Sequence, residues 1–83
     1  MSDDTQVMST TDRLVYMAHQ IARNFATLGE DGAVEAVASH LSSYWDPRMK
    51  AHIIAIARDR PERLSPVVTG AVARIARHAP DAQ

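Results

Sequence analysis

Four stretches of the chain place apolar residues three and four positions apart, which is the spacing of an amphipathic α-helix. Nowhere do apolar and polar residues alternate with the period of two that a half-buried strand requires. The pattern therefore predicts an all-α fold, a small four-helix domain with short connections, with helices near residues 11–28, 31–44, 47–58 and 66–78. The apolar stripes are, in chain order, Leu14, Met17, Ala18, Ile21, Ala22, Phe25 and Leu28; Val34, Val37, Ala38 and Leu41, continuing to Tyr44 or Trp45; Met49, Ile53, Ile56 and Ala57; and Val68, Ala71, Val72, Ile75 and Ala76.

Two helix starts are marked by a capping residue followed by proline. Asp46-Pro47 predicts a break after the second helix, because aspartate caps helices and proline suits the first helical turn. Ser65-Pro66 repeats this arrangement before the fourth helix. The linker 59–63 is polar, and Pro61 disfavours helical geometry at Arg60.

The first two helices have weaker boundary signals. Any of residues 10–12 (Thr, Thr, Asp) can cap the first helix, and Gly29 is expected to end it, since glycine is common just past a helix. Glu30 or Asp31 is expected to open the second helix. Gly70, inside the fourth helix, costs about 1 kcal/mol relative to alanine. The sequence leaves open whether this glycine marks a close helix contact or is simply tolerated.

The chain has 83 residues, which is enough for one small domain. We expect a disordered N-terminal tail over residues 1–10, a helical domain over 11–79 and a C-terminal tail over 80–83. Because cysteine is absent, stability must come from packing or from a partner. No apolar run approaches the roughly 20 residues of a membrane span. The N-terminus also lacks the pattern of a signal peptide, so we expect a cytoplasmic protein.

The residue types that carry enzyme chemistry do not cluster in the sequence. No two histidines share a helix face at a spacing of four, and the three glycines stand too far apart to form a phosphate-binding loop. Capping explains Asp12, Asp31 and Asp46, which stand at predicted helix starts. We therefore predict no catalytic residue, no bound cofactor and no metal on this chain.

Charge is unevenly distributed, although the whole chain carries a net charge of only −1. Residues 1–45 sum to −4 and residues 46–83 sum to +3. A basic C-terminal half suits a small helical adaptor that binds nucleic acid or an anion, with Arg48 and Lys50 at the start of a recognition helix. However, the chain is not basic overall, and few polar side chains remain to read bases. We therefore treat nucleic-acid or anion binding as the alternative to a role in binding another protein.

Two groups of residues are of the types most often found as interface anchors, namely tyrosine, tryptophan and arginine. On the first helix, polar residues three and four apart share one face with a tyrosine. At the corner between the second and third helices, two aromatic residues stand beside an arginine. The sequence leaves open whether the first face is an ordinary wetted surface and whether Trp45 belongs to the core. The predicted partner-interface residues are Arg13, Tyr16, Gln20, Arg23, Tyr44, Trp45 and Arg48.

Two blocks of the sequence resemble a known family. Residues 13–25 (RLVYMAHQIARNF) are similar to the first helix of the delta subunit of NAD-dependent, molybdenum-containing formate dehydrogenases. His40-Leu41, followed by residues 44–49 (YWDPRM), resembles the central signature of the same family, and the order and spacing of the blocks agree. The likeness covers roughly residues 12–78, although the fourth helix matches only in its pattern.

This resemblance implies a non-catalytic accessory subunit of a soluble formate dehydrogenase complex. In that family the large alpha subunit holds a molybdenum (or tungsten) pterin centre and several iron–sulfur clusters. The beta and gamma subunits carry FMN, the NAD site and further clusters. The delta subunit is expected to bind and stabilise the catalytic alpha subunit and to help its assembly. The implied partner is thus the alpha subunit, within a complex with beta and gamma, and neither nucleic acid nor membrane.

Overall fold

The computed structural model describes residues 9–77, and within them the chain forms four α-helices and two 3₁₀ turns. The elements are α2 (Thr10–Asn24), η1 (Ala26–Leu28), α3 (Gly29–Tyr44), α4 (Pro47–Asp59), η2 (Pro61–Arg63) and α5 (Pro66–Arg77). This part of the chain contains no strand, so the predicted all-α fold with four helices is confirmed. Residues 1–8 and 78–83, which include most of the expected N-terminal tail and all of the expected C-terminal tail, lie outside the described residues.

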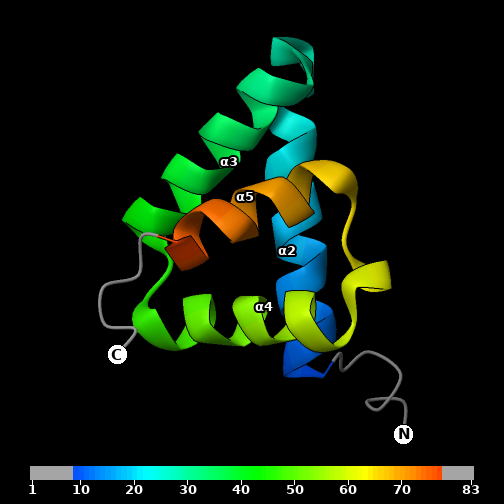
Figure 1. The fold of residues 1–83 in the computed structure, drawn as a ribbon, viewed down its shortest axis with the longest axis vertical. Coiled ribbons are helices and arrows are strands. Elements are labelled where there is room, and N and C mark those ends of the chain that lie inside the picture. Colours follow the sequence, from blue (N-terminus) through cyan, green and yellow to red (C-terminus); the bar gives the residue numbers. More distant parts are fainter. Residues whose placement is uncertain (1–8, 78–83) are drawn as a thin grey trace, which may run out of the picture.

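Figure 1 shows α5 crossing the middle of the molecule, α3 leaning along one side and α4 lying across the lower end. Helix α2 runs lengthwise behind α5 and α4. The most extensive contact between helices joins α3 and α5. All four helices contribute to one core, whose largest fully buried side chains are Leu41, Ile53, Val37, Val68 and Val72.

Hydrogen bonds confirm the two helix starts that the sequence marks most clearly. Asp46 Oδ1 accepts from the N–H of Met49 at 2.8 Å at the start of α4. Ser65 Oγ accepts from the N–H of Val68 at 3.3 Å at the start of α5. Arg60, which precedes a proline, is non-helical with φ −137°. Local side-chain chemistry therefore sets these boundaries.

Helix α2 differs from the prediction at both ends. Its cap is Ser9, whose Oγ accepts from the N–H of Asp12 at 3.0 Å, and not one of residues 10–12. The helix ends at Asn24 instead of running on to residue 28. The N–H of Phe25 bonds to the carbonyl three residues back, at 3.1 Å, which tightens the last turn and leads into η1.

The turn between α2 and α3 also differs from the prediction. Gly29 has φ +85°, a left-handed conformation that glycine adopts without steric cost, and it follows the last residue of η1. The prediction that Gly29 ends the first helix is wrong, because α2 already ends at Asn24. Helix α3 begins at this same glycine and has no side-chain cap, so neither Glu30 nor Asp31 opens it as a cap. Both carboxylates lie in the first turn, where they complement the helix dipole.

Three residues of the predicted apolar stripes lie on the surface. Leu28 is 55% exposed because η1 rotates it away from the stripe of α2, and Ala76 is exposed near the end of α5. The sequence predicted that the second stripe continues to either Tyr44 or Trp45. In the structure Trp45 is buried and Tyr44 is exposed. The stripe of α3 therefore continues through Trp45.

Gly70 marks a close contact between α3 and α5. A Cβ atom at this position would lie 3.1 and 3.3 Å from the two methyl groups of Val34. Such distances are tighter than ordinary van der Waals contact, so the missing side chain lets the two helices approach each other. The sequence left open whether Gly70 marks a close helix contact or is simply tolerated, and the structure shows the close contact.

Candidate interaction surface

The corner between α3 and α4 turns two adjacent aromatic side chains in different directions. Trp45 is only 5% exposed and belongs to the hydrophobic core. Tyr44 is 75% exposed, more than any other large hydrophobic side chain among residues 9–77. The Lys50 ammonium donates to the carbonyl of Ser42 at 3.2 Å and thereby links the first turn of α4 to the last turn of α3. Together with the Asp46 cap, this bond fixes the corner from which Tyr44 projects.

The ring of Tyr44 rests against His40, one turn earlier on α3. Their ring centroids are 4.7 Å apart, within the usual range for contacting aromatic rings, and their planes meet at 41°. Sequence reasoning assigned no role to His40, although its spacing of four from Tyr44 is readable in the chain. Arg48 is exposed in the first turn of α4. We call Tyr44, Arg48 and the supporting His40 the corner patch.

The second group of predicted interface residues lies on α2. Arg13, Tyr16, Gln20 and Arg23 are all exposed, Tyr16 by 55%, on the side of the helix away from its buried residues. Neither arginine makes an ion pair or hydrogen bond through its side chain with any described residue. We call these four residues the α2 patch.

The structure divides the seven predicted interface residues into three locations. Four form the α2 patch, Tyr44 and Arg48 belong to the corner patch, and Trp45 lies in the core. In Figure 1 the α3–α4 corner stands at the left edge of the molecule, away from the axis of α2. The two patches are therefore separate surfaces, and the indole ring is not available as a surface anchor in this fold.

Several polar side chains that the sequence did not assign connect α2 to the rest of the fold. His19 Nδ1–H donates to the carbonyl of Val15 at 2.8 Å, and its Nε2 accepts from the N–H of Ser65 at 3.0 Å. Because the carbonyl can only accept and the amide can only donate, this ring is neutral with its proton on Nδ1. Thr11 Oγ1 and His52 Nε2 share a further hydrogen bond of 3.0 Å between α2 and α4. These two histidines serve the packing of helices.

Asp12 forms the one ion pair of α2 with a distant element among the described residues. Arg63 in η2 donates to Asp12 Oδ1 at 3.0 Å. This hydrogen bond holds the pKa of the Asp12 carboxyl below its ordinary value of 3.8, and a contribution from Ser9 acts in the same direction. The carboxylate therefore helps to fix η2 against the start of α2.

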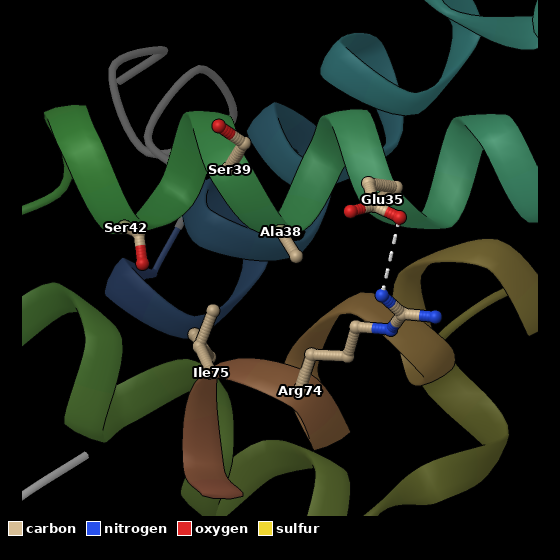
Figure 2. A pocket seen from close by; sticks show the side chains of 6 residues that line it. All are labelled: Glu35, Ala38, Ser39, Ser42, Arg74 and Ile75. Carbon is tan, nitrogen blue, oxygen red and sulfur yellow. Dashed lines mark hydrogen bonds and ion pairs between the residues drawn. The ribbon is translucent and has the colours of Figure 1, made fainter. Parts of the chain in front are cut away.

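A shallow hollow of about 210 Å³ lies between α3 and α5. In Figure 2, Ala38 and Ile75 point toward one another across it, and the ion pair of Glu35 with Arg74, at 3.4 Å, spans one end. Ser39 and Ser42 complete the lining. Ligand pockets usually enclose roughly 300–1,000 Å³, so this hollow is smaller than a typical ligand pocket.

Residues 9–77 bring no three histidine, aspartate or glutamate side chains close enough together to hold a metal ion. In the same range, no helix is both long and apolar enough to cross a membrane.

The fold and these surfaces define a small all-α domain in which half-buried polar side chains such as His19 and His52 link the domain's own elements. Over residues 13–72 the chain matches the family model described as NADH-dependent formate dehydrogenase delta subunit FdsD. Since the match covers more than half of the chain, the protein belongs to this family. Comparison with curated proteins gives no match, and neither does comparison with solved structures.

Proposed function

We propose that this chain is a non-catalytic accessory subunit that binds and stabilises the molybdenum-containing catalytic subunit of a cytoplasmic, NAD-dependent formate dehydrogenase. It also helps to assemble the cofactor-loaded form of that subunit. The direct partner is the alpha subunit, within a complex that includes beta and gamma. The molybdenum pterin centre, the iron–sulfur clusters, FMN and the NAD site lie on those partners.

Family membership is the observation that carries this proposal. The family description places such chains in a multi-subunit formate dehydrogenase, and the matched residues 13–72 contain both the α2 patch and the corner patch. The composition agrees with a role without cofactors, because the chain has no cysteine to supply thiolate ligands to a cluster.

The two patches are the surfaces that we assign to the contact. Tyr16, Tyr44 and Arg48 are exposed, and removing their side chains takes little from the core of the free domain. Tyrosine and arginine are also the residues that most often dominate binding energy when a partner desolvates them. The hollow between α3 and α5 offers a further place for a partner side chain.

Co-expression with the three larger subunits tests the proposal. An affinity-tagged full-length chain is expected to capture the alpha subunit in stoichiometric amounts, also when beta and gamma are left out. Tyr16→Ala and Arg48→Ala are expected to reduce the captured amount, whereas Leu28→Ala, which removes an exposed side chain outside both patches, is expected to leave it unchanged.

A second readout tests the role in assembly. The molybdenum content of alpha subunit produced without this chain is expected to fall below that of alpha subunit produced with it. Capture of beta or gamma without alpha would contradict the assigned partner. Equal molybdenum content with and without the chain would contradict the role in assembly.

A further inference from the structure

We propose that Tyr44 is a preorganised anchor for the catalytic subunit, that His40 is its positioning residue, and that the ring enters an apolar slot with an acidic rim on that subunit. This inference rests on the proposed function and adds the conformation of one contact residue and the chemistry of the surface that receives it.

The ring of Tyr44 adds little to the packing of the free domain. Its side chain is 75% exposed, while the next residue, Trp45, is 5% exposed and fills the core. The corner is fixed without the phenol ring, by the Asp46 cap and by the hydrogen bond from Lys50 to Ser42. Tyr44 therefore projects from a rigid site and contributes little to holding that site together.

The ring of His40 lies against that of Tyr44. Among the described residues, the Tyr44 ring has one ring partner, with centroids 4.7 Å apart, whereas Tyr16 has none. A surface side chain usually loses rotamer freedom when a partner captures it, and that loss weakens binding. Because His40 already restricts the Tyr44 ring, less freedom remains to be lost. Preorganisation of this kind raises affinity without any new contact.

Positively charged side chains lie near Tyr44 at the α3–α4 corner. The guanidinium of Arg48 is exposed and pairs with no described residue. The carboxylate of Asp46, two residues before Arg48 in the sequence, already accepts the capping hydrogen bond from Met49. Lys50 adds a second positive charge at the same corner. A matching surface offers an apolar slot for the ring and a carboxylate that Arg48 reaches with two parallel hydrogen bonds.

The experiment measures the dissociation constant of the full-length chain for the purified catalytic subunit by calorimetry. Tyr44→Ala is expected to weaken binding by about 30-fold, which corresponds to ~2 kcal/mol, the size of an interface hot spot. Leu28→Ala is the matched control, since it removes a side chain that is 55% exposed at the opposite end of α3. This control is expected to bind as the wild type does, and both variants are expected to melt within a few degrees of the wild type.

A double-mutant cycle isolates the role of His40. His40→Ala is expected to weaken binding about 5-fold in the wild-type background and to have no effect in the Tyr44→Ala background, because it acts only through that ring. His40→Phe keeps a ring against Tyr44 and is expected to bind as the wild type does. Equal losses in both backgrounds would show that His40 touches the partner itself and would overturn its positioning role.

The acidic rim has its own test. Raising the salt concentration is expected to weaken binding of the wild type more than binding of Arg48→Ala, because screening acts on the pair that this variant lacks. An equal salt dependence of the two proteins would contradict an acidic rim on the partner.

If the wild type binds and Tyr44→Ala binds equally well, the role of Tyr44 as an anchor is wrong while the proposed function stands. If the wild type does not bind the catalytic subunit at all, the proposed function fails and the inference fails with it.

Discussion

Replacing Trp45 by alanine should severely destabilise the free domain. The side chain is 5% exposed and lies in the single hydrophobic core. An aromatic side chain of this size buries about 150–250 Å². At about 25 cal/mol per Å² this corresponds to ~4–6 kcal/mol, in line with the ~3–5 kcal/mol usually lost when a core tryptophan is truncated to alanine.

This loss is comparable to the whole stability of a domain of this size. At about 0.05–0.15 kcal/mol per residue, 83 residues give a free energy of unfolding of ~4–12 kcal/mol. A loss of ~4 kcal/mol lowers the melting temperature of such a domain by about 15 °C or more. Trp45→Ala is therefore expected to be unfolded or to melt far below the wild type, with Trp45→Phe in between.

Thermal denaturation followed by circular dichroism measures this effect. The neighbouring variant Tyr44→Ala is the control, because the side chain is 75% exposed and its loss should lower the melting temperature by only a few degrees. A Trp45→Ala protein that melts within about 3 °C of the wild type would refute the placement of the indole ring in the core. Such a result would mean that Trp45 is again a candidate for contact with the partner.

Three further changes test particular contacts. Gly70→Ala is expected to give no gain in stability despite the ~1 kcal/mol preference of helices for alanine, because the new Cβ meets Val34 at 3.1 and 3.3 Å. In a Val34→Ala background the same change should stabilise by ~1 kcal/mol, and an equal effect in both backgrounds in urea denaturation would contradict the close contact. His19→Ala should lower the free energy of unfolding by about 1–2 kcal/mol, because the N–H of Ser65 loses its acceptor. The control Gln20→Ala, at an exposed position, should lower it by less than about 0.5 kcal/mol. Equal urea-denaturation midpoints for the two variants would disprove the link between His19 and Ser65. Because the pKa of Asp12 is lowered in the folded state, its carboxylate stabilises the fold above pH 3.8 and that contribution is lost as the pH falls through the lowered pKa. The difference in free energy of unfolding between wild type and Asp12→Asn should thus shrink below pH 3.8, and a constant difference down to about pH 2 would be inconsistent with the ion pair.

Local chemistry explains which parts of the fold could be predicted from the sequence. Asp46-Pro47 and Ser65-Pro66 set two helix starts through hydrogen bonds that span three residues, so short-range reasoning located them correctly. The end of α2 carries no such signal. Its apolar spacing continues to Leu28, but the chain tightens at Phe25 and turns, and the last residue of the stripe becomes exposed.

The candidate site shows the same limit. The spacing of residues on α2 correctly predicted one exposed polar face, because a helix of this length fixes which side chains share a side. At the α3–α4 corner the helix ends at Tyr44, and the exact position of that end decides whether Tyr44 or Trp45 faces the core. The sequence could not decide between them. Hydrogen bonds such as that between His19 and Ser65 join residues 46 positions apart, so they follow from the packing of helices and not from any local pattern.

The proposed function requires that this chain binds and stabilises the catalytic subunit of a formate dehydrogenase. The most direct test is the melting temperature of the purified alpha subunit, measured as increasing amounts of the full-length chain are added. A ligand that binds only the folded state stabilises it by ~2.7 kcal/mol at one hundred times its dissociation constant, so the account predicts a melting temperature that rises with concentration. The Tyr44→Ala chain should need a higher concentration to produce the same rise. A melting temperature of the alpha subunit that stays constant over the whole titration would contradict the account.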